Sequence, residues 1–323
     1  NRVAAKDKMQ EFRKQKELEE DKYEIAKIEK QITRFKNRQH AMKIQLNSGY
    51  GAFGSAYFRY FDIRQATAIT NGGQFVIRWA IREINRYMNK LLKTKDLDYV
   101  IASDTDSLYI NMERLVDQVF GDDQSDPVKI TKFLDKVFKT KIEPFIEEFY
   151  DRLAKRTNAF ANKMQMKREN IASLGIWTGK KRYVLDIWDE EGVLYKEPKL
   201  KIIGLEAIKS STPGVCRNAL KAATVIIARG TEEQLQEHIT KFRSEYNKYP
   251  VEDIAKPSGM DGLDDYTLNS KSIPIHVRAS LSYNKILQEK KLTKKYDMIK
   301  NGEKVKFCYL RMPNTSHQNV IAF

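Results

Sequence analysis

Apolar residues are sparse and regularly spaced in the first 47 residues, which are highly charged and nearly free of Gly and Pro. This pattern predicts helix, with one apolar face at Ile25, Ile28, Ile32 and Phe35. One continuous helix would run roughly 70 Å at about 1.5 Å per residue. A hairpin that turns around residues 20–23 is more compact and is the arrangement we expect. The three glycines of NSGYGAFG (residues 47–54) should then break the second helix.

Two further apolar stripes predict long helices after this break. One stripe has the spacing i, i+4, i+7, i+11 and i+14 and consists of Ile77, Ile81, Ile84, Met88 and Leu91. We expect Gly72 and Gly73 to lie near the start of that helix. A second helix is expected over residues 127–156, with a kink at Pro144.

Residues 164–204 change to a strand pattern, in which KKRYVLDIWD and GVLYKEPKLKII flank a turn at Glu190, Glu191 and Gly192. After these strands, Thr212 is the expected N-cap of a helix with Pro213 at its first position. A capping box at Thr231 and Gln234 opens the next helix, which should end before residue 250. Turns and short strands follow.

The fold class predicted from this order is α+β. Helices come first, a mixed block of helices and strands follows, and a mainly helical block with an irregular tail completes the sequence. We expect three modules, over residues 1–50, 51–205 and 206–323.

Charge and composition narrow the classes of function. The chain has 323 residues with 58 Lys and Arg against 43 Asp and Glu, and its net charge of +15 favours a polyanion such as nucleic acid as partner. A generally basic, soluble surface is the alternative explanation. No apolar run has the length of a membrane span, so no membrane partner is expected. Two cysteines without a CxxC pair indicate a reducing compartment, and four scattered histidines do not have zinc-ligand spacing.

Two aspartates at the bend of an expected hairpin are the main candidates for chemistry. Asp104 and Asp106 lie in YVIASDTDSLYINM, between two runs of strand-forming residues. In an extended strand, residues i and i+2 face the same side, so the two carboxylates could project together. Neighbouring carboxylates repel unless a cation intervenes, and Mg²⁺ prefers such oxygen ligands. A polar turn without any metal remains the alternative.

Several further motifs occur in a fixed order along the chain. SDTDSLY resembles the motif YGDTDSxY, and KIQLNSGYG resembles KxxxNSxYG. Both motifs are those of family B DNA polymerases, and the resemblance is greatest to the T-even-type bacteriophage group. WTGKKRY, EPKLKIIGLEAIKSSTP, RYFDIRQATAIT and IHVRASLSYN continue the likeness across essentially the whole chain. The resemblance implies a palm hairpin and antiparallel sheet, preceded by a fingers module of two antiparallel helices (1–50) and followed by a thumb (206–323). Residues 51–205 would be the C-terminal part of the palm.

The resemblance also implies a role for each aspartate and a pair of Mg²⁺ ions. Asp106 matches the ligand of both catalytic metals, whereas Asp104 matches a less direct contributor that could instead shape the turn. Ser103 replaces the usual Gly before the pair. Glu169 matches a carboxylate near the metal site, but Lys167 stands where the phage relatives carry Asp, which leaves an additional metal there open.

A nucleotide-binding face is implied by the fingers motifs. Lys43, Asn47 and Tyr50 have the spacing i, i+4 and i+7, which places them on one helix face. In the family the Lys contacts the incoming triphosphate and the Tyr packs beside the nascent base pair. Arg2 and Lys6 match a second triphosphate-binding pattern, RxxxKxxM. They could share a nucleotide with Lys43 only if the first 47 residues form a hairpin, because one straight helix separates Lys6 from Lys43 by roughly 55 Å.

DNA contacts are implied for two further groups. The KKRY element should begin a strand and contact the minor groove of the primer-template duplex; it comprises Lys180, Lys181, Arg182 and Tyr183. Expected phosphate contacts in the thumb are Lys201, Lys209, His276 and Arg278.

The family's other metal ligand lies in a DxxSLYP motif, which this sequence lacks. We therefore expect part of a replicative DNA-directed DNA polymerase, weak or inactive alone, that needs an N-terminal polymerase half from the same gene or a separate subunit. Its partners would be primer-template DNA and dNTP, in the cytoplasm of an infected bacterial host. A sliding clamp is a further expected partner, through a C-terminal tail of the phage relatives that this sequence does not reach. The alternative is a non-catalytic DNA-binding module derived from a polymerase.

Overall fold

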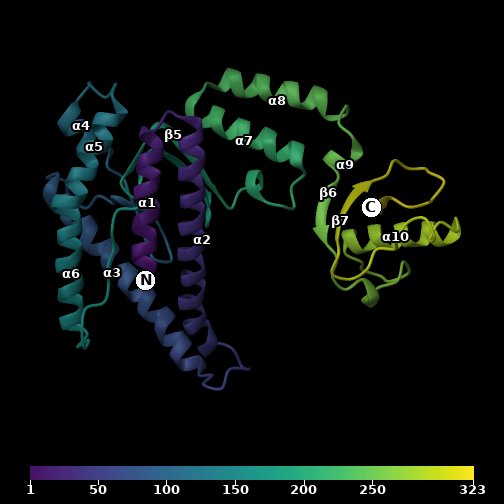
Figure 1. Cartoon of the computed structure of the whole chain (residues 1–323), viewed down its shortest axis with the longest axis horizontal. Helices are drawn as coiled ribbons and strands as arrows, with labels where there is room; N and C mark the ends of the chain where they lie inside the picture. The colour runs from purple at the N-terminus through teal and green to yellow at the C-terminus, as the bar shows by residue number, and fades with distance from the viewer. The chain divides into compact units, whose positions relative to one another are not determined.

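The computed structural model describes residues 1–323 as an α+β protein (Figure 1). Its α-helices are α1 (Arg2–Leu18), α2 (Lys22–Phe53), α3 (Ile63–Leu91), α4 (Glu113–Phe120), α5 (Pro127–Val137), α6 (Glu143–Arg156), α7 (Gly214–Arg229), α8 (Glu232–Tyr246), α9 (Val251–Ile254) and α10 (Ile275–Glu289). Its strands are β1 (Val100–Asp104), β2 (Ser107–Ile110), β3 (Asn170–Gly179), β4 (Arg182–Glu190), β5 (Val193–Ile203), β6 (Lys256–Gly259), β7 (Lys304–Tyr309) and β8 (Val320–Ala322).

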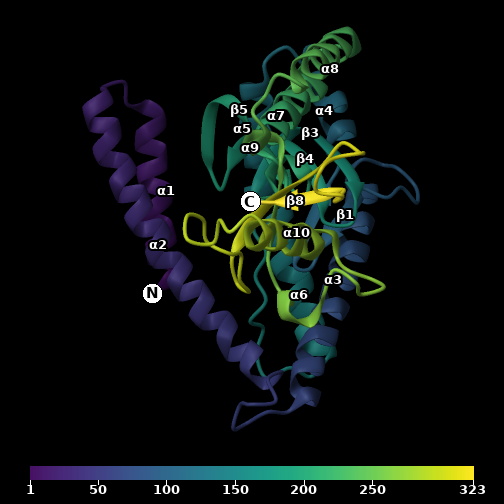
Figure 2. The same cartoon turned by 90° about the vertical axis from the view of Figure 1, so that its right-hand side faces the viewer.

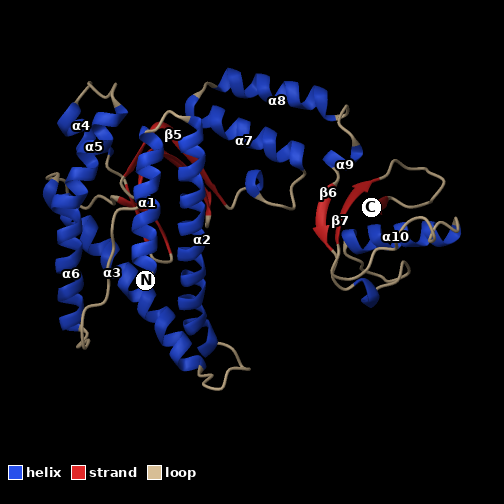
Figure 3. Cartoon of the chain, viewed as in Figure 1, coloured by secondary structure: helices blue, strands red, loops and turns tan.

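The strands form three small sheets with the orders β1–β2, β3–β4–β5 and β6–β7–β8. Figure 3 draws the strands in red among the more numerous blue helices. By its contacts the chain divides into two compact units. The first consists of Asn1–Gly175 and Leu185–Lys199, and the second consists of Ile176–Val184 and Leu200–Phe323.

The predicted hairpin at the N-terminus is confirmed. α1 ends at Leu18, and the side chain of Asp21 accepts hydrogen bonds from the first backbone N–H groups of α2. Figure 2 shows the two helices side by side, running in opposite directions. The break expected over residues 47–54 comes only at the end of that stretch, because α2 continues through Gly49 and Gly51 and ends at Phe53, with Gly54 as its C-cap. An internal glycine costs a helix only about 1 kcal/mol, which is too little to end it.

α3 also differs from its predicted start. It begins at Ile63, where the side chain of Asp62 accepts a hydrogen bond from the backbone N–H of Arg64, so Gly72 and Gly73 lie inside the helix. The predicted apolar stripe is confirmed at Ile84 and Met88, which are fully buried. It is wrong at Leu91, which is 40% exposed at the end of the helix.

The predicted helix over 127–156 is divided by one turn of π-helix over Phe138–Ile142. Pro144 lies at the start of α6, next to this turn. Because proline lacks a backbone N–H and crowds the preceding turn, a wider turn before it lets the chain continue as α6 without a break. α5 and α6 pack with α3 around a core that includes Ile84, Met88, Ile142 and Phe149.

The second unit contains α7, α8 and a small module formed by α10 and the sheet β6–β7–β8. Pro213 is the N-cap residue of α7 and Gly214 its first residue, so the predicted cap at Thr212 is wrong; the extended ψ of Pro213, 148°, keeps it outside the helix. The capping box of Thr231 and Gln234 is confirmed. In the C-terminal module, Met260, Val277 and Val320 are among the residues of a separate core.

Candidate functional site

The aspartate hairpin is held at its base by α3. The side-chain oxygen of Asn85 accepts hydrogen bonds from the backbone N–H groups of Tyr99 and Val100, both at 2.9 Å. The amide of Asn85 donates to Asp98 at 2.9 Å. These bonds fix the first residues of β1 against a helix that carries part of the main core.

The tip of the hairpin is a two-residue turn. Asp104 pairs with Ser107, so that Thr105 and Asp106 alone connect the strands. Thr105 has φ +58°, in the left-handed region that favoured two-residue turns require but that a β-branched residue rarely adopts. Its hydroxyl donates to Asp104 Oδ1 at 3.0 Å. Backbone strain of this kind is typical of functional sites.

The expectation that both carboxylates share one face of an extended strand is wrong. The chain bends at Thr105, so Asp104 ends β1 while Asp106 lies in the turn itself. Asp106 is exposed and Asp104 is half-buried. The two carboxylates therefore differ in environment, and Asp106 is the more accessible to a cation or a ligand.

A fit for two divalent cations needs more oxygen ligands than this turn supplies. The structure contains no group of three or more His, Cys, Asp and Glu side chains that could hold a metal ion. Asp104, Asp106 and Glu169 therefore do not form such a group with one another. Two neighbouring carboxylates match the oxygen chemistry of Mg²⁺, but they do not complete a two-metal site.

The N-terminal hairpin places the predicted phosphate-binding cations at similar positions along the axes of its two helices. Phe12 stacks on Phe35 with ring centroids 5.8 Å apart, and Lys16 pairs with Glu29 at 2.6 Å. In this antiparallel register the numbers of facing residues add up to 45–47. Arg2 is therefore level with residues 43–45 of α2, and Lys6 with residues 39–41. The predicted Lys43, Asn47 and Tyr50 are all exposed on α2.

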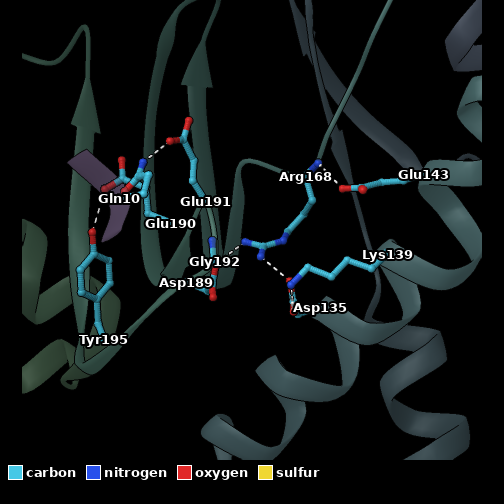
Figure 4. A network of polar contacts seen from close by, with 10 residues as sticks. All are labelled: Gln10, Asp135, Lys139, Glu143, Arg168, Asp189, Glu190, Glu191, Gly192 and Tyr195. Atoms are coloured by element: carbon cyan, nitrogen blue, oxygen red, sulfur yellow. Dashed lines mark hydrogen bonds and ion pairs between the residues drawn. The ribbon is translucent and has the colours of Figure 1, made fainter. Parts of the chain in front are cut away.

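One face of α1 docks on the turn between β4 and β5 (Figure 4). Lys6 and Gln10 both bond to Glu191, and Arg13 lies 3.5 Å from Glu190. Glu191 and Gly192 form the predicted turn, and both have positive φ, as in a type I′ hairpin. An acidic turn is thus stabilised by donors at i, i+4 and i+7 of one helix.

A buried arginine holds the opposite side of the same turn. Arg168, whose side chain is 5% exposed, forms ion pairs with Asp189 of β4 and Asp135 of α5 (Figure 4). Asp189 also accepts a hydrogen bond from the backbone N–H of Gly192 at 2.8 Å. The backbone N–H of Arg168 donates to Glu143 at 3.0 Å. The segment that carries Glu169 is therefore anchored to both a helix and the sheet.

Two pKa values in this network depart from their ordinary range. Burial alone would raise the pKa of Asp135, but hydrogen bonds from Lys139 and Arg168 outweigh it and lower the pKa. Burial raises the pKa of Tyr195, and its hydrogen bond to the Glu190 carboxylate at 2.7 Å raises it further. Asp135 is thus held ionised, while the Tyr195 hydroxyl is held neutral as a donor.

The KKRY element lies at the β3–β4 turn rather than wholly in a strand. Lys180 and Lys181 connect the strands, and only Arg182 and Tyr183 belong to β4, so the expectation that the element begins a strand is confirmed for its second half alone. Arg182 pairs with Glu206 at 2.7 Å. Tyr183 is buried and stacks on Trp177.

The remaining predicted DNA contacts lie in the second unit. Lys201 is half-buried in β5, and Lys209 pairs with Glu206 at 2.9 Å. His276 and Arg278 lie in the first turn of α10 and are half-buried. The structure brings Arg182 and Lys209 to one carboxylate, Glu206.

Sequence patterns do not identify Glu191, Arg168 and Asp189 as ion-pair partners in the network around this turn. They place Glu190 and Glu191 in a turn and no more. Two adjacent carboxylates repel, and donors such as Lys6, Gln10 and Arg13 on one helix face could have been suggested as their partners. Nothing in the local sequence pairs Arg168 with Asp135, 33 residues away.

A family comparison defines the class of protein to which this fold and hairpin belong. The model of DNA polymerase family B matches residues 13–322, so the chain is a member of that family.

Two phage proteins are particularly similar to it. The chain is 34% identical over 310 residues to the DNA-directed DNA polymerase of Enterobacteria phage T4, and 36% identical over 311 residues to that of Escherichia phage RB69. Each match covers 93% of this chain, and the chain spans about a third of each relative (34% and 33%). DNA polymerase 1 of Aeropyrum pernix is 22% identical over 255 residues, which cover 75% of this chain and 21% of that protein. None of the helices described here is both long and apolar enough to cross a membrane.

Proposed function

We propose that this chain is part of a replicative DNA-directed DNA polymerase, which transfers a nucleotide from a dNTP to a primer 3′ end as directed by a template. The observation that carries the proposal is the two-residue turn at the tip of β1–β2, which exposes Asp106 in a chain of family B. Residues 1–50 act as fingers, 51–205 as the C-terminal part of the palm, and 206–323 as the thumb. Its place of action is the cytoplasm of an infected bacterium.

The proposed metal ligands are Asp106, Asp104 and Glu169. Mg²⁺ ions, when bound, would activate the primer 3′ hydroxyl and neutralise charge on the departing pyrophosphate. Because the turn supplies too few ligands for two ions, the other carboxylates come from a polypeptide outside these residues, the N-terminal polymerase half. Thr105 orients the Asp104 carboxylate through its hydroxyl.

The proposed nucleotide-binding surface is the α1–α2 hairpin. Lys43 and Arg2 lie at similar levels on facing helices, which supports a shared contact with a triphosphate. Fixed cations at the phosphates stabilise charge that develops on pyrophosphate as it leaves. Asn47 and Tyr50 follow Lys43 on the same exposed face, where Tyr50 can pack beside the nascent base pair.

The proposed duplex-binding surface is basic and reads the shape of the duplex rather than its sequence. Lysines at a two-residue turn can approach the phosphates and minor groove of a primer-template closely. Its residues are Lys180, Lys181, Arg182, Tyr183, Lys201, Lys209, His276 and Arg278. The net charge of +15 supports this partner, and a sliding clamp is a further proposed partner of the complete polymerase.

Primer extension by this chain, mixed with the N-terminal polymerase half, tests the proposal. We expect extension from the pair, little or none from this chain alone, and a loss on the order of a hundredfold or more for Asp106→Asn in the pair. Asp122→Asn, in an exposed loop, is the matched control and should leave the rate unchanged. If Asp106→Asn left the rate of primer extension unchanged, the chain would instead be a non-catalytic DNA-binding module. The absence of three or more grouped metal-ligating side chains favours that second function.

A further inference from the structure

A groove between α3 and α6, within the first unit, belongs to none of the sites described above. Its volume is about 910 Å³, and its lining comes entirely from these two helices. Volumes of roughly 300–1,000 Å³ are typical of ligand sites. The lining includes the rings of Trp79, Tyr87 and Phe145 and the cations of Lys90 and Arg156.

The charges in the groove are only partly compensated. Glu83 is buried and pairs with Arg86 at 2.6 Å and Arg152 at 2.8 Å. Glu148 also pairs with Arg152, at 2.6 Å, so that two carboxylates offset two guanidinium groups. Lys90 and Arg156, in contrast, have no carboxylate within ion-pair distance in the structure. The groove therefore presents two uncompensated cations.

The two cations lie at different levels along the groove. The Arg156 guanidinium lies 5.5 Å from the centre of the Trp79 ring. Lys90 is eleven residues further along α3 than Trp79, which corresponds to about 16 Å at 1.5 Å per residue. An extended peptide covers that length in about five residues, at roughly 3.4 Å each.

A buried donor at one end of the groove lacks an acceptor. The indole Nε1–H of Trp79 is buried and has no hydrogen-bond partner. Buried indole groups usually find a partner, so an unsatisfied one in the lining of a groove indicates a missing acceptor. A carbonyl or carboxylate oxygen beside Arg156 would satisfy both groups.

The rings are not available as a stacking platform. Tyr87 and Phe145 stack on each other with centroids 4.2 Å apart, and Arg152 lies 5.8 Å from the centre of the Phe145 ring. Arg156 covers a face of Trp79. Single-stranded nucleic acid binds by stacking its bases on free ring faces, and its closely spaced phosphates would meet the exposed carboxylate of Glu148. Ligands with sparse negative charge and apolar side chains fit better.

We propose that the α3–α6 groove binds an extended acidic peptide segment of a partner protein. Two carboxylates about five residues apart pair with Arg156 and Lys90, and a peptide carbonyl accepts from Trp79 Nε1. Apolar side chains between the carboxylates contact Leu91 and the edges of the Tyr87 and Phe145 rings. This site is independent of the polymerase chemistry proposed above.

The test uses the full chain and a fluorescein-labelled peptide with blocked termini, Glu-Ser-Phe-Leu-Ser-Glu. Saturable binding by fluorescence anisotropy is expected, and replacement of both peptide glutamates by glutamine should weaken it. Lys90→Gln and Arg156→Gln should each weaken binding about two- to fivefold, since each removes one exposed ion pair. Lys155→Gln, the same change at an exposed position of α6 outside the groove, is the control and should have no effect.

The indole ¹⁵N–H resonances locate the bound peptide. Trp79 should shift on addition of peptide, whereas Trp177 and Trp188 should not, with Trp79→Phe used for assignment. Unchanged affinity in the Lys90→Gln/Arg156→Gln double variant would overturn the proposal. It would equally be overturned if the peptide left the Trp79 resonance unmoved, or if a dT12 oligonucleotide, and not the peptide, bound in a manner sensitive to Arg156→Gln.

Discussion

Lys6 of α1 forms an ion pair with Glu191 in the β4–β5 turn, so a cation proposed to contact the triphosphate already has an anionic partner. The Lys6 side chain is 40% exposed and that of Glu191 is 18% exposed, which leaves the pair accessible to solvent. Lys6 can bind a triphosphate only if it contacts the phosphate and Glu191 together or if its ion pair with Glu191 breaks. Glu191 therefore acts as a competitor of the nucleotide for Lys6.

Glu191→Gln should strengthen nucleotide binding. The substitution keeps a hydrogen-bond acceptor for Gln10 but removes the charge that holds Lys6, so we expect binding of Mg·dTTP about two- to fivefold tighter, in line with one exposed ion pair. Isothermal titration calorimetry on the chain measures it. Glu190→Gln is the control, because Glu190 pairs with Arg13 and Lys199 instead. Weaker binding in Glu191→Gln would mean that Glu191 positions Lys6 for the nucleotide.

Gly204→Ala should destabilise the protein strongly. Gly204 has φ +69°, and a Cβ there would lie 2.0 Å from the backbone oxygen of Lys181 at the β3–β4 turn. Neither backbone segment can yield cheaply, so we expect a loss of about 3 kcal/mol or more in the free energy of unfolding by urea. Gly214→Ala, with open space at the start of α7, should be neutral or stabilise by up to about 1 kcal/mol. Equal effects of the two substitutions would contradict this account.

Local sequence signals predicted the elements of this fold better than their ends. The capping box at Thr231 and the turn at Glu191 and Gly192 involve residues close in sequence, and both were confirmed. Glycine was overestimated as a helix breaker: α2 runs through Gly49, since about 1 kcal/mol is a small cost within a 32-residue helix. The π-helical turn before Pro144 depends on how α5 and α6 pack, which periodicity does not report.

The geometry of the candidate site could be predicted only for residues that are neighbours in the sequence. The hairpin that carries Asp104 and Asp106 followed from strand patterns, but the left-handed Thr105, which places Asp106 in the turn and not in the strand, did not. A β-branched residue is a poor candidate for positive φ, so local propensity predicts the wrong geometry there. The contact of Lys6 with Glu191 joins residues 185 positions apart, and no local rule selects that pair.

Arg168→Met should cost far more stability than removal of an exposed arginine. The substitution leaves the carboxylate of Asp189, 6% exposed, without its cation, and loss of one partner from a buried ion pair costs about 3–5 kcal/mol. Arg64→Met is the matched control, because Arg64 is 89% exposed in its pair with Asp62, and it should change the free energy of unfolding by less than about 1 kcal/mol. Urea unfolding measures both. A loss of under 1 kcal/mol for Arg168→Met would show that Asp189 is satisfied without it.

The lowered pKa of Asp135 predicts a loss of stability that occurs only at acidic pH. The pKa of Asp135 in the folded protein is lower than its ordinary value of 3.8. As the pH falls, the unfolded chain therefore binds a proton at Asp135 before the folded protein does. The contribution of Asp135 is therefore fully present above that value and is lost as pH falls through the lowered folded pKa. Urea unfolding of the protein and of Asp135→Asn, at about pH 5 and about pH 3, measures this loss as a smaller difference between them at the lower pH. An equal difference at both values would mean that Lys139 and Arg168 do not favour the ionised carboxylate.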